Sequence, residues 1–250
     1  YRYLGYAAYK NGNVDVAIKS LESFIAAPGN KAIALDYLYL GLTKIKKGTS
    51  ADGLAIDATA FNAGLVDIKK AVEMEPLAVQ DLSEVGKKLF TQKLYKEAAS
   101  IFEFGANIAD SKTYLDDNVY YGLSNYYANN SKDVKPDVIA LQKADAAFER
   151  VLVASPTYHE AYLYRARTNR LLDKDDVMTK NYEDYVAKVT ALGAEETAKP
   201  AVKAKIIESY NNIAANYANT DKAKAIEYFR KTLALDPANA YATESLKTLK

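Results

Sequence analysis

Several residue types are scarce or missing in this chain of 250 residues, and each absence excludes a class of chemistry. There is no cysteine, which excludes disulfides, thiolate zinc sites, iron–sulfur clusters and cysteine nucleophiles. The single histidine, His159, leaves almost no basis for histidine metal sites or for a serine–histidine catalytic pair. No apolar run reaches the roughly 18 residues that indicate a membrane-spanning helix. We therefore expect no cofactor, no metal and no membrane span.

The chain also lacks an excess of charge of either sign. The chain has 33 Lys+Arg and 32 Asp+Glu, a net charge of +1, which argues against a nucleic-acid partner. Glycine (11) and proline (6) are few while 49% of residues are hydrophobic, as in a globular chain rather than a disordered one. Tyrosine is abundant, with 21 residues and no tryptophan. The composition thus predicts a folded protein with unusually many tyrosines.

A pattern of small and large residues recurs along the chain, and such repeats indicate stacked supersecondary units. Small residues lie at equivalent positions of the expected first helices: Gly5, Gly41, Gly86, Gly122, Ala166 and Ala214. Five of the six expected second helices have a small residue followed four positions later by a large one: Ala17 and Leu21, Gly64 and Ile68, Ala98 and Phe102, Ala144 and Phe148, Ala225 and Phe229. In the fifth repeat Asn181 stands where the small residue is expected. A small residue opposite a large one lets two helices approach closely. Proline ends three of the units, at Pro76, Pro156 and Pro237.

This pattern resembles the tetratricopeptide (TPR) repeat, a helical hairpin of 34 residues. The resemblance implies an all-α fold, a right-handed TPR-type superhelical solenoid of about six hairpins with a C-terminal capping helix. The repeats would cover 1–30, 31–76, 77–110, 111–156, 157–192 and 193–237, and the cap 238–250, in a single domain of 1–250. Because Tyr1 already lies within a helical pattern that has no polar cap, we expect a fragment of a longer protein.

Two connections within hairpins are longer than the repeat requires, at 48–60 and 129–140. Leu54 and Ile56 make the first one partly apolar. It could fold back as a short helix, offer a second contact edge, or be ordinary variation in loop length. The sequence leaves the role of both inserts open.

The few residues that could support catalysis have simpler explanations. His159 follows Ser155-Pro156 at the expected start of a helix, where a solvated first-turn residue is the ordinary reading. The run Asp173–Asp176 lacks the glycine and the terminal glutamate of a calcium loop, so it is read as an acidic helix start. We therefore expect no enzyme activity.

The family resemblance places a binding groove on the first helices. Carried over residue by residue, it implies an aromatic and basic surface, because these residue types often anchor partners. The candidates are Tyr6, Tyr9, Lys10, Lys46, Lys87, Phe90, Tyr126, Tyr127, Arg167 and Arg170. For the tyrosines, packing between repeats is the alternative. The carboxylate clamp of chaperone-binding TPR modules is missing, since the matching positions are Arg2, Tyr6, Tyr39, Gln80 and Glu84.

The expected function is a protein-interaction scaffold that binds a peptide or helix in its concave groove. A row of lysines and arginines would favour an acidic or C-terminal carboxylate ligand. The alternatives are a structural spacer within a larger envelope protein and a peptide-sensing regulator. The tyrosine- and asparagine-rich sequence resembles TPR arrays of bacterial envelope and exported proteins. That resemblance favours the periplasm or cell envelope over the cytoplasm, and the oligomeric state stays open.

Overall fold

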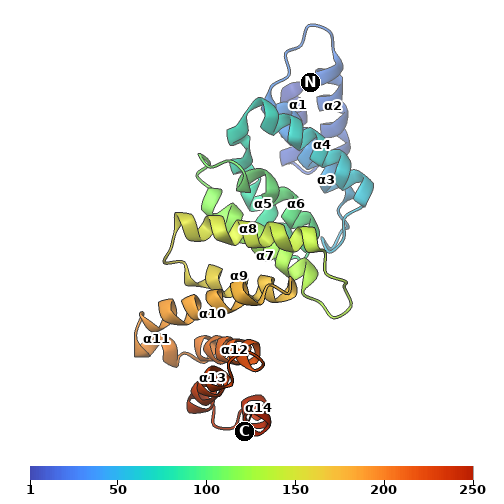
Figure 1. Ribbon diagram of the computed structural model, residues 1–250. Coiled ribbons are helices and arrows are strands. Elements are labelled where there is room, and N and C mark those ends of the chain that lie inside the picture. Colours follow the sequence, from blue (N-terminus) through green and yellow to red (C-terminus); the bar gives the residue numbers. More distant parts are fainter. Residues whose placement is uncertain (250) are drawn as a thin grey trace. The chain divides into compact units, whose positions relative to one another are not determined.

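The computed structural model describes residues 1–249, and helices make up almost all of its regular structure (Figure 1). They are α1 (Arg2–Lys10), α2 (Val14–Ala26), α3 (Ala34–Gly48), α4 (Ala58–Met74), the 3₁₀ helix η1 (Pro76–Asp81), α5 (Ser83–Thr91), α6 (Tyr95–Ala106), α7 (Tyr114–Asn129), α8 (Val138–Ala154), α9 (His159–Leu171), α10 (Asp175–Thr190), α11 (Ala194–Ala198), α12 (Pro200–Tyr217), α13 (Lys222–Leu235) and α14 (Ala240–Thr248). The predicted all-α fold is confirmed. None of the described helices has the length and apolar character needed to cross a bilayer.

The helices form two compact units, one of residues Tyr1–Ala128 and one that begins at Asn129. In the first unit α1 pairs with α2, α3 with α4 and α5 with α6, and α2 also packs on α3. In the second unit α9 pairs with α10 and α12 with α13, while α8 packs on α9 and α14 on α13. Antiparallel pairs joined by short turns are the arrangement that the sequence repeat predicts. The single domain of 1–250 and its repeat boundaries stay a prediction.

The small residues of the repeat lie where two helices of a hairpin come closest. A Cβ atom built on Gly41 would lie 2.5 Å from the backbone oxygen of Gly64, and one on Gly64 would lie 2.6 Å from the oxygen of Gly41. On Gly86 it would lie 2.6 Å from the ring of Phe102. The large partners are buried, with Ile68 at 0% and Phe102 at 1% exposure. The predicted contact between small and large residues is therefore confirmed in these hairpins.

In three helical hairpins the connection between the helices contains one residue in the left-handed backbone conformation. These residues are Gly12 (φ 77°), Lys93 (φ 62°) and Asp173 (φ 54°). Asp173 thus lies in the connection between α9 and α10. Asp175 and Asp176 lie in the first helical turn of α10. Carboxylates in the first turn are stabilised by the positive N-terminal end of the helix dipole. Among residues 1–249 no three His, Asp or Glu side chains gather as metal ligands would. The reading of this acidic run as a helix start is confirmed.

The insert between α3 and α4 is not a helix, so that alternative was wrong. It is a loop closed by a single antiparallel bridge between Thr49 and Ile56. The Ser50 amide donates to the Ala55 carbonyl (2.9 Å), and the Ser50 hydroxyl donates to Asp52 Oδ1 (2.6 Å). These local hydrogen bonds stabilise an extended loop, and they take the place of the hydrogen bonds that a helix would form. Leu54 remains 61% exposed.

The end of the chain follows the sequence expectations closely. Pro200 opens α12, where its missing N–H leaves no helical hydrogen bond unmade. The connection before it contains the short helix α11. At the C-terminus, Leu246 and Leu249 pack against a core of Ala214, Phe229 and Ala242. The predicted capping helix is confirmed as far as Thr248, and Lys250 lies outside the described residues.

One first helix departs from the repeat. After Pro76 the chain forms η1, so α5 begins only at Ser83 and has 9 residues, against 15 in α3. The 3₁₀ turn buries Val79 and Leu82, at 0% and 1% exposure. A 3₁₀ segment where an α-helix is expected has poorer hydrogen-bond geometry and often marks a functional or strained place.

Candidate functional site

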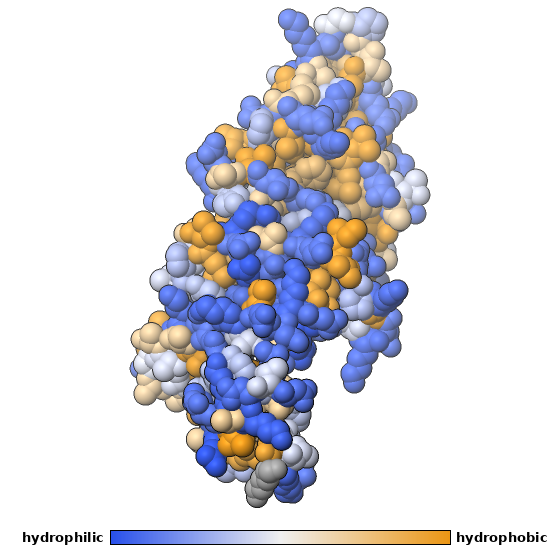
Figure 2. Space-filling model, viewed as in Figure 1, coloured by the Kyte–Doolittle hydropathy of each residue, from blue (hydrophilic) through white to orange (hydrophobic). Residues whose placement is uncertain are grey.

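The surface carries both polar side chains and separate apolar patches. Figure 2 shows a face that is largely hydrophilic, with hydrophobic side chains gathered at several places.

In the first hairpins the structure brings Tyr6, Tyr9 and Lys46 together. The rings of Tyr6 and Tyr9 pack against Tyr39 of α3, whose ring centroid lies 4.8 Å from that of Tyr6 and 5.0 Å from that of Tyr9. Lys46 Nζ lies 5.6 Å from the Tyr9 ring, in reach of a cation–π contact. Lys10 is exposed at the end of α1. Tyr39 was not predicted because it precedes Gly41, and only residues after that position were assigned to the groove.

A cavity of about 220 Å³ adjoins this aromatic cluster. It lies between α1, α3 and α5, with Tyr9, Leu42, Ile45 and Leu89 among its walls and Lys46 and Lys88 at its edge. Both lysines are exposed, and among the described residues neither forms an ion pair. We call this cavity the groove pocket. An apolar hollow with two unpaired cations suits a ligand with an apolar side chain and a carboxylate.

The candidate residues of the next two first helices, α5 and α7, are largely used within the protein. Lys87 Nζ lies 3.2 Å from both Asp116 Oδ2 and Glu84 Oε1. Phe90 packs edge-on against Tyr127, at 5.9 Å between centroids. Tyr126 is 4% exposed. These positions therefore contribute packing and paired charge, and offer little free surface to a ligand.

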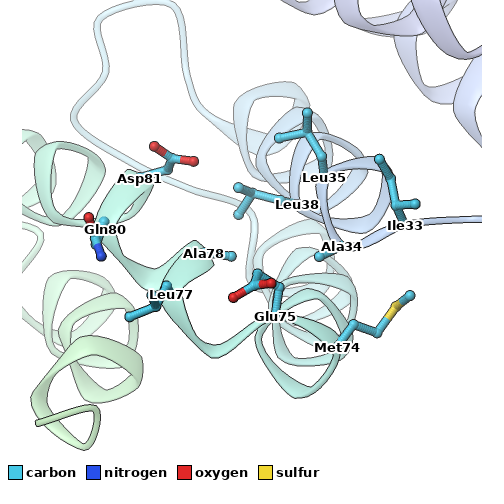
Figure 3. Close-up of a pocket in the computed structure, with 10 residues that line it drawn as sticks. All are labelled: Ile33, Ala34, Leu35, Leu38, Met74, Glu75, Leu77, Ala78, Gln80 and Asp81. Carbon is cyan, nitrogen blue, oxygen red and sulfur yellow. The ribbon is translucent and has the colours of Figure 1, made fainter. Parts of the chain in front are cut away.

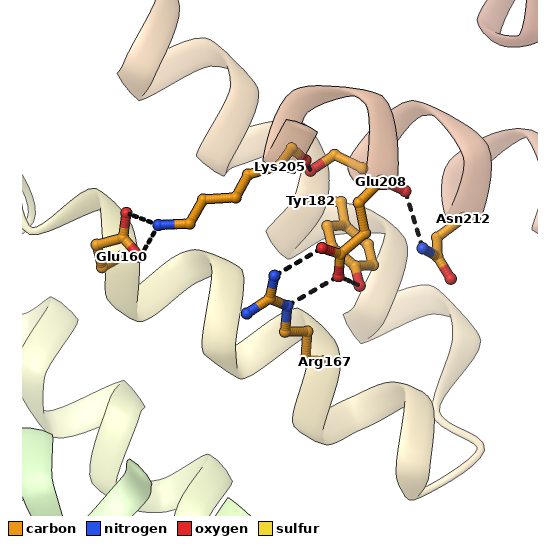
Figure 4. Close-up of polar contacts among 7 residues, drawn as sticks. Glu160, Arg167, Tyr182, Lys205, Glu208 and Asn212 are labelled. Atoms are coloured by element: carbon orange, nitrogen blue, oxygen red, sulfur yellow. Dashed lines mark hydrogen bonds and ion pairs between the residues drawn. The ribbon is translucent and has the colours of Figure 1, made fainter. Parts of the chain in front are cut away.

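In the second unit, Arg167 is held by Glu208 of α12 (Figure 4). Arg167 Nε and Nη2 donate to the two carboxylate oxygens at 2.8 and 2.6 Å, a bidentate pair. The Tyr182 hydroxyl donates to the same carboxylate at 3.1 Å. Nearby, Lys205 Nζ donates to Glu160 at 2.8 and 3.0 Å. Arg170 is exposed, without an ion pair in the described part of the chain.

The Glu208 carboxylate is held in its charged form. Burial alone would raise its pKa above the ordinary 4.5, but the hydrogen bonds and charge of Arg167, with the Tyr182 hydroxyl, lower the pKa below that value. Sequence reasoning missed Glu208, because only positions after the small residue of each first helix were assigned to the groove. Glu208 lies six residues before Ala214, the small residue of that helix.

This lowered pKa predicts a pH dependence of stability. A carboxyl group with a folded pKa below its unfolded value stabilises the fold above the unfolded value, and that contribution disappears as pH falls through the folded pKa. The difference in unfolding free energy between the wild type and Glu208→Gln should therefore be largest near pH 7 and shrink as the pH falls below the ordinary value of 4.5. Urea unfolding at a series of pH values measures it. Glu244→Gln, at an exposed site, is the control, and a difference independent of pH would contradict the assignment.

His159 takes a structural place. It opens α9, its side chain is 27% exposed, and its ring centroid lies 6.1 Å from that of Tyr185. The Tyr185 hydroxyl is buried and has no hydrogen-bond partner among the described residues. Within residues 1–249, His159 forms no hydrogen bond with a serine or threonine side chain. His159 therefore lies in the first turn of α9, as the sequence predicts, but it packs near Tyr185 and is not fully solvated.

A scan of protein-family models and a search of curated proteins give no match. Solved structures are similar in fold. The C-terminal part of a TPR repeat-containing protein from Cytophaga hutchinsonii is 25% identical, with a TM-score of 0.53 over 97% of this chain and 84% of that one. YrrB, described as a TPR protein with an unusual peptide-binding site, is 16% identical, with a TM-score of 0.50 over 86% of this chain and 92% of that one.

Proposed function

We propose, on the premise that this chain is an array of TPR hairpins, that it is a non-enzymatic interaction scaffold that binds a peptide or a helix of a partner protein. Stacked hairpins offer extended surfaces for binding, and function in such folds resides in the particular site. The observation that carries the proposal is the groove pocket, where Tyr9 and aliphatic side chains surround a hollow edged by Lys46 and Lys88.

The groove pocket defines the chemistry of the proposed ligand. Its walls are mainly apolar, and the unpaired ammonium groups of Lys46 and Lys88 give it positive charge. The ligand is a segment with one large apolar side chain beside Asp, Glu or a C-terminal carboxylate. The Tyr9 ring packs on Tyr39, which also packs on Tyr6, so this wall of the pocket is preorganised and loses little entropy on binding.

The spacer function is the second candidate, and one observation favours it. Lys87 and Arg167, two of the predicted groove cations, are already paired with carboxylates of the protein. Their charges stabilise neighbouring hairpins and are not available to a ligand without the loss of those pairs. A spacer would bind no class of peptide, which separates it from the scaffold.

The test is an array of short peptides in which one large apolar residue is flanked by acidic, basic or serine residues. The wild type should prefer the acidic set. The double variant Lys46→Glu with Lys88→Glu should bind this set about tenfold more weakly, because reversal of two rim charges removes roughly 1.4 kcal/mol. The control is Lys19→Glu with Lys96→Glu, which changes the net charge equally at exposed sites on α2 and α6. No preference for acidic peptides, or equal loss in the control, would refute the proposal.

A further inference from the structure

A second and larger cavity, of about 650 Å³, lies at the other end of α3. The start of α3, the end of α4 and the helix η1 surround it (Figure 3). It occurs where the chain forms η1 instead of the first turns of an α-helix. We call this cavity the η1 pocket. Its volume is within the range of pockets that hold ligands.

The walls of the η1 pocket are apolar and partly open to solvent. Ile33, Met74 and Leu77 are 45%, 47% and 45% exposed around it, although they are large aliphatic side chains. Leu38 lies deeper and is 1% exposed, and Ala78 leaves space because its side chain is a single methyl group. Figure 3 shows these side chains arranged around one hollow. Exposed apolar residues that cluster at a concave place indicate a contact surface.

The charge at this pocket is of one sign. Glu75 and Asp81 are both exposed members of its lining, and no Lys or Arg belongs to the lining. Neither carboxylate has an ion-pair or hydrogen-bond partner among residues 1–249, unlike the acids Asp36, Asp67 and Asp116 of the same unit. Two unpaired carboxylates beside an apolar hollow attract a cation that reaches the pocket together with an apolar group.

We propose that the η1 pocket binds a basic peptide segment of a partner protein, in which a large apolar side chain is flanked by Lys or Arg. The apolar side chain fills the hollow against Leu38 and Ala78, and the basic side chains pair with Glu75 and Asp81. The site differs from the groove pocket in place and in charge. The groove pocket adjoins Ile45 and Lys46 near the end of α3, whereas this one adjoins its first residues.

Two changes to the pocket test this proposal with the same peptide array. Glu75→Lys with Asp81→Lys reverses the charge, and Ala78→Phe fills the hollow without a change of charge. Asp110→Lys with Glu244→Lys is the matched control, because both acids are exposed, lie outside the pocket and give the same change in net charge. Circular dichroism melting confirms that each variant is folded.

The wild type should bind the basic set more tightly than the serine set. Both pocket variants should weaken this binding about tenfold, while the control and the Lys46→Glu, Lys88→Glu variant retain it. Equal binding of basic and serine peptides, or unchanged binding by Ala78→Phe, would overturn the proposal. So would self-association that Ala78→Phe abolishes in the absence of peptide binding, because the occupant would then be a second copy of this chain. Loss of acidic-peptide binding alone concerns only the groove pocket.

Discussion

Replacement of Asp36 by alanine is expected to lower the free energy of unfolding by about 2–4 kcal/mol. The Asp36 side chain is fully buried, at 0% exposure, and accepts four hydrogen bonds. Two come from Arg2 (2.9 and 2.8 Å), one from the Tyr6 hydroxyl (2.6 Å) and one from the Ile33 amide (2.8 Å). The variant would leave these donors without their acceptor. Arg2 is 23% exposed and regains some hydration, which keeps the cost below that of a wholly buried pair.

Chemical unfolding of three variants separates the contributions. Tyr6→Phe removes one hydrogen bond and should cost about 1 kcal/mol. Asp36→Asn keeps an oxygen acceptor but turns an amide toward Arg2, so its cost should lie between those of Tyr6→Phe and Asp36→Ala. Glu73→Ala removes an exposed carboxylate of α4 and should stay within about 0.5 kcal/mol. If Asp36→Ala behaved like Glu73→Ala, the buried network would not exist in solution.

The same network should weaken in acid. Burial would raise the pKa of Asp36, but the hydrogen bonds of Arg2, Tyr6 and the Ile33 amide outweigh burial and hold its pKa below the ordinary 3.8. Since the folded pKa is the lower one, the stabilisation is complete above the unfolded value and is lost as pH falls through the folded value. The penalty of Asp36→Asn should therefore decrease on acidification, as expected for Glu208→Gln.

The helical hairpins were predictable because their determinants lie close together in sequence. Gly5 and Leu21, or Gly86 and Phe102, belong to helices joined by one short turn, so a fixed spacing encodes their contact. Proline at Pro76 correctly indicated a helix end. The 3₁₀ form of the following turn was not predictable, because it depends on how Val79 and Leu82 reach the core rather than on local propensity.

The charge pairs were not predictable for a different reason. Lys87 and Arg167 were placed on the groove by their position in the repeat, and both lie on the first helices as expected. Their partners, Asp116 and Glu208, come from the next first helix along the chain. Whether two such side chains meet depends on the rotation between neighbouring hairpins, which the repeat pattern does not encode. A surface that is basic by sequence is therefore partly neutral in the structure.

Replacement of Gly64 by alanine should destabilise the protein, although the opposite is expected of an ordinary helix position. In an exposed helix interior alanine is favoured over glycine by about 1 kcal/mol. At Gly64 a Cβ would lie 2.6 Å from the Gly41 carbonyl oxygen and 2.6 Å from Ile45 Cγ1. The carbonyl belongs to the backbone of α3, so relief requires α3 and α4 to move apart. We expect a net loss of about 1–3 kcal/mol, as for other overpacked contacts.

The neighbouring exposed residue Ala63 supplies the control on the same helix. Ala63→Gly should cost about 1 kcal/mol through helix propensity alone, so adjacent substitutions in opposite directions should both destabilise. Gly41→Ala should resemble Gly64→Ala, because its Cβ would meet the Gly64 carbonyl at 2.5 Å. The double variant should cost less than the sum of the two, since one separation of the helices relieves both contacts. Stabilisation by Gly64→Ala in urea unfolding would mean that α3 and α4 do not touch through their backbones, and additive costs would mean that the two glycines do not share one contact.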